Sequence, residues 1–379
     1  MDQYSTDLIE RTIIGFIYTK PKLIDEVFIK EEYFNNPYNR LIFKVTLEFY
    51  QKNKHLDLIL IYQEYQKYVT DKFIIFITEC NNLIATTTIF HEYQEKLFEY
   101  LERIKNMVSN KNCDYLSEED IYDIINKSNK QINFRFNSLN NLIELKEQDF
   151  IIIGARTGVG KTGFALNLLE DISDRYKCLY FNMEMSEQQV LKRLVSINSK
   201  VPMSKLTNPD TEYQRNVVKE SIKNISQKKI KIITGIQSTN SIKQVIIRES
   251  KEEHIVVFID YIGLMAGYSN KSLYESTTKI VKELRQLSLR FDCTIIGMAQ
   301  INRNGADDNA EPQLKDLKDS GELEQSAVSC ILLHKTKTNE QQLTDEIEVI
   351  VAKNRNGRTG TLIFEYYKPN QQFNERKRY

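Results

Sequence analysis

A glycine-containing loop between an apolar run and a helical pattern has the residue types needed to hold a phosphate. The apolar run Ile151 to Ile153 leads into this loop, and a helical pattern begins at Gly163. In such a strand–loop–helix order, backbone N–H groups and the helix N-terminus face the phosphates of a nucleotide. Lys161 is expected to reach the β- and γ-phosphates, and Thr162 to ligate Mg²⁺. The predicted nucleotide-binding residues are Ala155, Arg156, Thr157, Gly158, Val159, Gly160, Lys161 and Thr162, although the strict pattern has glycine at 155.

Polar residues at the ends of later apolar runs are candidates for holding the metal and activating water. Asp260 ends the run Ile255 to Ile259, where burying a carboxylate is costly without a cation, so we predict that Asp260 also holds the Mg²⁺. Hydrolysis needs a group that activates water as well. Glu184 follows another apolar run, and its position alone allows either this role or that of a solvated helix-start residue. Gln300 ends a third run, where it either senses the γ-phosphate or forms part of a turn.

The elements that must position these residues alternate along the C-terminal two thirds of the chain. Short β-rich runs are separated by helical stretches, an order typical of a parallel sheet flanked by helices. Two further runs, 347–352 and 361–366, flank a segment with two glycines and predict a hairpin. The β-rich runs before the hairpin span residues 150–153, 178–181, 230–233, 255–259, 294–296 and 330–333.

Residues 1–108 follow a helical pattern, and strand-like alternation is largely missing there. Apolar residues recur at helical spacing behind a cap candidate at Ser5 or Thr6. Pro37 opens a second helix, and a longer amphipathic helix is predicted from Phe90 to Val108. We therefore predict a small all-α domain over this part of the chain, with a role in packing or assembly.

A polar and charged segment, residues 109–134, separates the two parts of the chain. Within it, Ser117 is a good cap for a short amphipathic helix. An isolated helix between two domains is either only a linker or a helix that docks on a neighbouring subunit, and the sequence leaves both open.

The composition restricts how the chain can meet its partners. Lys+Arg and Asp+Glu both number 52, so a nucleic acid would have to meet a local basic lining, such as the inside of a ring. The five cysteines include no Cys-x-x-Cys pair, which argues against a zinc site and a disulfide framework. The N-terminus lacks the pattern of a secretion signal and no apolar run is long enough to span a bilayer, so we expect a cytoplasmic protein.

With these motifs in place, the chain resembles the DnaB-type replicative helicases over nearly its full length. Residues 155–162 are similar to the family's phosphate-binding loop, which often has alanine at the first position. Phe181-Asn182-Met183-Glu184-Met185-Ser186 looks like the motif whose glutamate is the catalytic base, so the resemblance gives Glu184 that role. Phe258 to Met265 looks like the Walker B segment around Asp260, and Ala299 to Arg303 like the sensor motif that contains Gln300.

Two further segments carry the most specific similarity. Asp316 to Gln325 resembles the segment that lines the central channel of the ring and holds the single-stranded backbone. At the contacting positions, this chain has Lys318, Asp319 and Gly321. Ala352 to Gly357 resembles a hairpin that reaches into the ATP site of the neighbouring subunit, where Lys353 and Arg355 would supply positive charge to the γ-phosphate in trans.

The resemblance implies a RecA-like P-loop ATPase domain over residues 135–379, preceded by a helical collar domain over 1–108 and the linker with its helix. We expect an ATP-dependent replicative DNA helicase that forms a homo-hexameric ring with ATP and Mg²⁺ at each interface. Such a ring would translocate 5′-to-3′ on single-stranded DNA, and its collar would meet primase and loader proteins.

Two alternatives share the motor core. A RecA-like recombinase would form filaments, and the helical N-terminal domain argues against it. A mobile-element ATPase would redirect host replication without unwinding DNA by itself, and the intact Lys161, Glu184, Asp260 and Arg355 argue against it.

Overall fold

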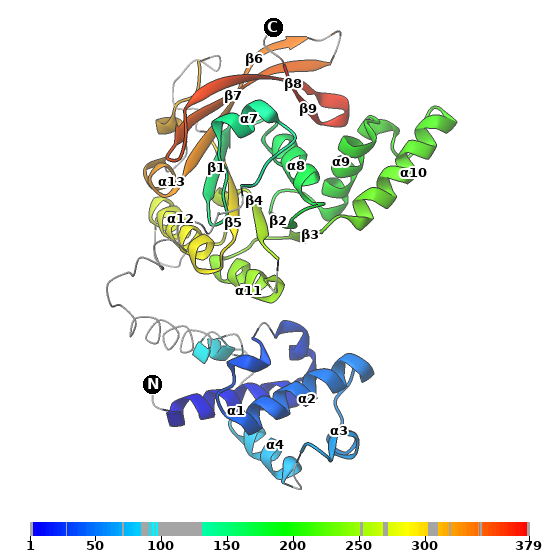
Figure 1. Cartoon of the computed structure of the whole chain (residues 1–379), viewed down its shortest axis with the longest axis vertical. Helices are drawn as coiled ribbons and strands as arrows, with labels where there is room; N and C mark the ends of the chain where they lie inside the picture. The colour runs from blue at the N-terminus through cyan, green and yellow to red at the C-terminus, as the bar shows by residue number, and fades with distance from the viewer. Residues whose placement is uncertain are drawn as a thin grey trace, which may run out of the picture. The chain divides into compact units, whose positions relative to one another are not determined.

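A computed structural model of the chain forms two compact units, Met1–Lys127 and Ser128–Tyr379 (Figure 1). The predicted helix capped by Ser117 and most of the predicted helix after Phe90 lie outside the residues that the structure describes. Those residues are 3–27, 29–69, 72–84, 90, 92–94, 96–97, 131–250, 253–267, 272–301, 310–317, 320–339, 341 and 343–376.

The N-terminal unit is helical, as its sequence predicts. Pro37 begins the second helix, and the Asn36 side chain caps it by accepting hydrogen bonds from the backbone N–H groups of Tyr38 and Asn39. The expected cap at Ser5 or Thr6 is wrong, because the first helix already begins at Gln3 and Thr6 is buried within it. The helices are α1 (Gln3–Thr19), α2 (Pro37–Asn53), α3 (Leu58–Tyr65) and α4 (Phe73–Asn82), packed around buried phenylalanines that include Phe16, Phe34, Phe43 and Phe49.

One nine-stranded sheet organises the C-terminal unit, in the order β3-β2-β4-β5-β1-β6-β7-β8-β9. The first six strands in this order run parallel to one another. Their bounds are β1 (Phe150–Ala155), β2 (Lys177–Asn182), β3 (Ile230–Thr234), β4 (Ile255–Asp260), β5 (Thr294–Gln300) and β6 (Ser329–Asn339). Each contains one of the β-rich runs that the sequence predicts, so the RecA-like arrangement of a parallel sheet with helices is confirmed.

The sheet continues as an antiparallel extension, which the sequence predicts only in part. β7 (Thr344–Asn354) and β8 (Gly360–Tyr367) form the expected hairpin. β7 also pairs antiparallel with β6, and β9 (Gln372–Glu375) adds an edge strand beside β8. Consecutive strands joined by short turns pair antiparallel. The parallel sheet and the hairpin are therefore as predicted, whereas the pairing of β7 with β6 and the edge strand β9 were not predicted.

Helices cover both faces of this sheet, and the alternation of side chains along β1 separates the two cores. Ile151 and Ile153 point into a cluster with residues of α8, α9 and α10, whereas Phe150 and Ile152 point into a cluster with residues of α11, α12 and α13. The helices are α7 (Asn137–Leu142), α8 (Lys161–Ile172), α9 (Glu187–Ser199), α10 (Glu212–Gln227), α11 (Thr239–Glu249), α12 (Leu273–Arg290) and α13 (Ser320–Ser326).

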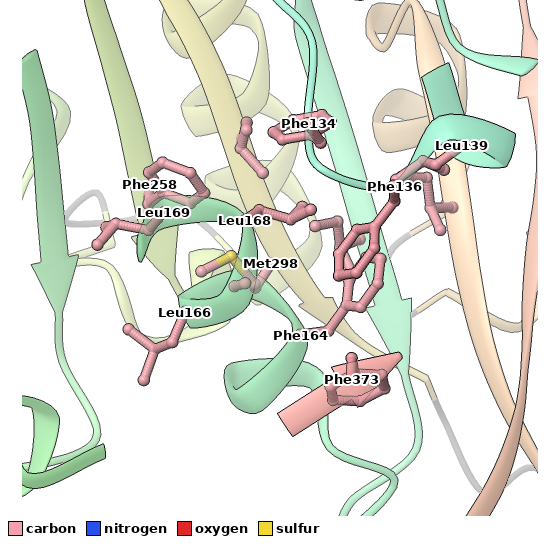
Figure 2. Packing of buried hydrophobic residues seen from close by; sticks show 14 of the residues in the cluster. Phe134, Phe136, Leu139, Phe164, Leu166, Leu168, Leu169, Phe258, Met298 and Phe373 are labelled. Atoms are coloured by element: carbon pink, nitrogen blue, oxygen red, sulfur yellow. The ribbon is translucent and has the colours of Figure 1, made fainter. Parts of the chain in front are cut away.

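Aromatic packing fixes α8, the helix that follows the glycine loop. Figure 2 shows Phe164 of α8 surrounded by aromatic side chains from other elements. Its ring centroid lies 6.2 Å from that of Phe136, 5.9 Å from that of Phe364 and 5.2 Å from that of Phe373. Aromatic pairs at these separations add to the stabilisation that comes from burial. The first turn of α8, which carries Lys161 and Thr162, is thereby anchored to the antiparallel end of the sheet.

Among the described residues, no helix combines the length and the apolar character needed to cross a membrane.

Candidate nucleotide-binding site

The glycine loop lies between the end of β1 and the start of α8, at the C-terminal edge of the parallel strands. Gly158 has φ 82° and Gly160 has φ 108°, backbone conformations that favour glycine. A Cβ atom on Gly160 would also lie 3.1 Å from carbons of the Tyr366 and Phe373 rings. Glycine at position 160 therefore serves both the turn into α8 and the close approach of this aromatic pair.

A cleft of about 380 Å³ opens at this loop. It brings together seven of the predicted nucleotide-binding residues with Glu184, from the turn after β2, and Gln300, the last residue of β5. Val159 is instead nearly buried, with 7% of its surface exposed. The residues that line the cleft are Ala155, Arg156, Thr157, Gly158, Gly160, Lys161, Thr162, Gly163, Glu184, Arg193, Tyr261, Gln300, Tyr366 and Gln371.

Asp260 lies at the base of this site and is completely buried. Its Oδ2 atom accepts a hydrogen bond of 2.7 Å from the Thr162 hydroxyl and one of 2.9 Å from the Tyr180 hydroxyl. Its Oδ1 atom has no hydrogen-bond partner among the described residues and lies 3.8 Å from the ammonium of Lys161. The carboxylate thus contacts both residues that the glycine loop contributes to the start of α8.

These contacts fit a Mg²⁺ ion. A hydroxyl has one hydrogen to donate and two lone pairs, so Thr162 can donate to Asp260 and still ligate a metal. A buried carboxylate oxygen without a hydrogen-bond donor is unfavourable, and a cation or its water would satisfy Oδ1 of Asp260. The atoms available to coordinate the ion are all oxygens, which are the ligands that Mg²⁺ prefers.

Lys161 is held over an aromatic ring at the start of α8. Its ammonium lies 4.2 Å from the centroid of the Tyr261 ring, close enough for a cation–π interaction. Burial lowers the pKa of Lys161, and the negative charges of Asp260 and Glu184 act in the opposite direction. A phosphate in the cleft would supply a further negative charge beside this buried cation.

Glu184 lies in the turn between β2 and α9, beyond the last strand residue Asn182. The Asn182 side chain accepts hydrogen bonds from the backbone N–H groups of Glu184 and Met185, at 3.3 and 3.1 Å. Ser186 then caps α9. Glu184 itself is exposed to the cleft, so the turn is fixed while its carboxylate stays accessible to water.

Gln300 ends β5 and reaches across to the glycine loop. Its side-chain Nε2 donates to the Thr157 hydroxyl at 3.0 Å. Arg156, on the same loop, donates to the backbone carbonyl of Ala310 at 2.8 Å. Asn302 and Arg303 of the predicted sensor motif lie outside the described residues.

Five cleft residues were not among the predicted site residues. Gly163 and Tyr261 directly follow predicted ones, whereas Arg193, Tyr366 and Gln371 lie elsewhere in the sequence. Arg193 of α9 donates to the side-chain oxygen of Gln371. Tyr366 of β8 stacks on Phe373 with ring centroids 4.4 Å apart, and burial raises the pKa of its hydroxyl to about 12. Arg193, Tyr366 and Gln371 come from α9 and from the antiparallel end of the sheet, and no motif or spacing connects them to the glycine loop.

The two predicted finger residues lie on a different part of the unit and do not line this cleft. Lys353 is near the end of β7 and donates to the backbone carbonyls of Glu324 and Ala327, the latter at 3.0 Å. Arg355 donates to the carbonyl of Gln325. Both cations therefore hold the C-terminal end of α13.

The predicted DNA-contacting segment is described only in part. Lys318 and Asp319 lie outside the described residues, whereas Gly321 is exposed in the first turn of α13. Leu317, immediately before them, is buried and pairs with Ile301 in an isolated antiparallel bridge. The segment is thereby anchored at one end to the strand that carries Gln300.

Comparison with known proteins identifies the family. Residues 132–375 match the family model of the DnaB-like helicase C terminal domain, and residues 2–106 match that of the DnaB-like helicase N terminal domain. The chain belongs to the DnaB-like helicase family. This family comprises replicative, ATP-dependent DNA helicases, and both of its domains are matched, so the recombinase and the mobile-element ATPase are not favoured.

Curated relatives carry corresponding names. The chain is 28% identical to a probable replicative DNA helicase of Trieres chinensis, with 88% of this chain and 86% of that protein covered. It is 22% identical to the replicative DNA helicase DnaC of Bacillus subtilis, with 96% and 93% covered. The match to the replicative DNA helicase DnaB of Helicobacter pylori, at 29% identity, covers 58% of this chain and 54% of that protein. The chain thus spans about half the length of this last relative.

Solved structures share the fold. A DnaB-like replicative helicase, described with its interactions with primase, is 24% identical with a TM-score of 0.62, and the match covers 97% of this chain and 99% of that one. A separate ATPase domain is 25% identical with a TM-score of 0.63, and the match covers 70% of this chain and all of that one.

Proposed function

We propose that this chain is an ATP-dependent replicative helicase that works as a homo-hexameric ring and moves 5′-to-3′ on single-stranded DNA. In this proposal residues 1–108 form the collar, 109–134 the linker with its docking helix, and 135–379 the motor. The observation that carries it is the contact of Lys161 and Thr162 with the buried Asp260 beneath a cleft that also exposes Glu184. Hydrolysis of ATP in this cleft is the reaction that such a family member would couple to movement.

Each residue of the cleft has a distinct task in this reaction. The backbone of the glycine loop and the ammonium of Lys161 bind the phosphates. Bound Mg²⁺, held by Thr162 and Asp260, would neutralise charge that develops on the phosphates. Glu184 accepts a proton from the attacking water, and Gln300 contacts the γ-phosphate from the end of β5.

A second subunit completes the site in this proposal. Neither Lys353 nor Arg355 lines the cleft of its own chain, and in this proposal both serve the cleft of a neighbour. Positive charge brought to the γ-phosphate in trans accelerates hydrolysis by about 10³–10⁵ in well-studied cases. Hydrolysis then requires assembly, which fits a ring with nucleotide between its subunits.

Lys318, Asp319 and Gly321 are proposed to hold the DNA backbone inside the ring. Contacts to phosphates do not depend on the base sequence, so binding through the backbone suits a motor that works on any template. A few contacts in each of six subunits also allow binding by a chain with 52 basic and 52 acidic residues. Primase and a helicase loader are proposed partners of the collar, and the cytoplasm is the proposed location.

The decisive experiment measures ATP hydrolysis with and without single-stranded DNA for the wild type, Glu184→Gln and Arg355→Ala. We expect hydrolysis that DNA stimulates and that both substitutions abolish without loss of assembly. A wild type that binds ATP but does not hydrolyse it with DNA present would contradict the proposal and favour a regulatory ATPase.

A further inference from the structure

Tyr180, in the middle of β2, contacts the candidate metal site from below the cleft. Its side chain is completely buried, and its hydroxyl donates to Oδ2 of Asp260 at 2.9 Å. The same oxygen receives the hydrogen bond from Thr162 at 2.7 Å. Tyr180 does not line the cleft, so it has no direct contact with a nucleotide bound there.

The sheet register explains why this hydroxyl reaches Asp260. Tyr180 is paired with Phe258 on the neighbouring strand β4, and Asp260 is two residues further along that strand. Residues two apart on a strand point to the same face, so Tyr180 and Asp260 lie diagonally across one face of the sheet. The length of the phenol ring spans this diagonal.

The Tyr180 hydroxyl is the donor in its contact with Asp260, because a carboxylate oxygen accepts hydrogen bonds. A buried hydroxyl also needs a partner, because leaving it without a hydrogen bond is costly. Asp260 is the partner that the structure provides.

We propose that Tyr180 is a positioning residue for the metal site, because its hydroxyl fixes the rotation of the Asp260 carboxylate. Carboxylate torsions are otherwise broad, so a single donor from Thr162 leaves the group free to turn. With both donors on Oδ2, the other oxygen Oδ1 faces Lys161 at 3.8 Å and remains available to the metal or its water. This inference rests on the proposed Mg²⁺-dependent hydrolysis of ATP.

The test replaces the hydroxyl alone, with Tyr180→Phe. Binding of a fluorescent ATP analogue is titrated with Mg²⁺, and hydrolysis is measured across the same Mg²⁺ range. We expect the half-saturating Mg²⁺ concentration to rise about tenfold in both measurements, the scale of a lost hydrogen bond to a charged group. Binding of the analogue without Mg²⁺ should stay the same, because Tyr180 does not touch the nucleotide.

Tyr18→Phe is the matched control. The Tyr18 hydroxyl, in the N-terminal unit, is hydrogen-bonded to the Thr46 hydroxyl at 2.8 Å and is far along the chain from the cleft residues. Its removal takes away the same atom from a half-buried tyrosine, so it should lower the thermal stability and leave the Mg²⁺ dependence unchanged.

Two results would overturn the inference. One is a Tyr180→Phe protein that binds and hydrolyses ATP with the wild-type Mg²⁺ dependence. The other is a variant whose only change is a loss of thermal stability comparable to that of Tyr18→Phe. If instead the wild type showed no Mg²⁺-dependent nucleotide binding, the proposed function would fail first, and the inference with it.

Discussion

The ammonium of Lys353 lies 3.0 Å from the backbone carbonyl oxygen of Ala327, just beyond the end of α13. A second hydrogen bond joins the same ammonium to the carbonyl of Glu324. Carbonyl groups at a helix end lack partners within the helix, and cations stabilise them. The residue proposed to act in a neighbour's ATP site thus also holds the helix that carries Gly321, one of the proposed DNA-contacting residues.

Replacing Lys353 by methionine keeps the length of the side chain and removes its donors. In the protein without nucleotide or DNA, we expect the amides of α13 to exchange hydrogen about tenfold faster, since a helix end loses two hydrogen bonds to a charged group. Hydrogen exchange followed by mass spectrometry measures this, and no ATP site is occupied during the measurement.

Arg358→Gln is the control for the loss of one positive charge from the same hairpin. Arg358 is exposed at the hairpin tip, and among the described residues no hydrogen bond or ion pair joins its side chain to α13. Unchanged exchange in Lys353→Met, or equal acceleration in both variants, would contradict a specific role for Lys353 at α13.

Mixing two inactive variants tests whether Arg355 acts in trans. Glu184→Gln alone should lower hydrolysis by about 10²–10⁴, and Arg355→Ala alone by about 10³–10⁵. In a random mixture of the two, about a quarter of the interfaces join an intact Glu184 to an intact Arg355 of the neighbour. DNA-stimulated hydrolysis should therefore return on mixing.

A second mixture serves as the control for that experiment. Glu184 and Lys161 line the same cleft of one chain, so mixing Glu184→Gln with Lys161→Ala creates no intact site. ATP hydrolysis that returns in this mixture as well would indicate residual activity of the variants. If neither mixture hydrolyses ATP, the result would argue against the action of Arg355 in a neighbour's site.

The acid stability of the C-terminal unit should depend on Glu249. Its carboxylate oxygens form ion pairs with the ammonium groups of Lys177, at 2.5 Å, and Lys231, at 2.6 Å. Only 13% of the Glu249 side chain is exposed. Burial by itself would raise the pKa of Glu249, but the hydrogen bonds from the two lysines prevail and lower it to about 2. A depressed carboxyl pKa stabilises the fold above the ordinary value of 4.5 and loses this effect as the pH falls toward 2.

Glu249→Gln should therefore lower the free energy of unfolding by about 1–2 kcal/mol at neutral pH. The difference from wild type should shrink between pH 5 and pH 3. Urea unfolding across this range measures it, and Glu253→Gln, which removes a 54% exposed partner of Lys229, is the matched control. A difference that stays constant across the range would contradict the assignment to Glu249.

The local elements and their order follow from the sequence. Short continuous apolar runs determine where β1 to β6 lie, because a strand buried on both faces of a sheet needs such a run. Gly158 and Gly160 supply the turn before α8, and Asp260 ends a strand that is otherwise apolar. These features depend on neighbouring residues, so a pattern within ten or so positions is enough to predict them.

The tertiary structure alone decides which distant residues meet. Tyr180 and Asp260 are 80 residues apart, and their contact depends on the register between β2 and β4, which no local pattern encodes. Tyr366 approaches Gly160 only because an antiparallel extension brings the end of the chain back beside α8. Lys353 would pass for a solvated hairpin charge in the sequence, yet packing of β7 beside α13 gives it two carbonyl partners. Local sequence patterns determine where helices and strands form, whereas strand register and packing determine which side chains from different elements come into contact.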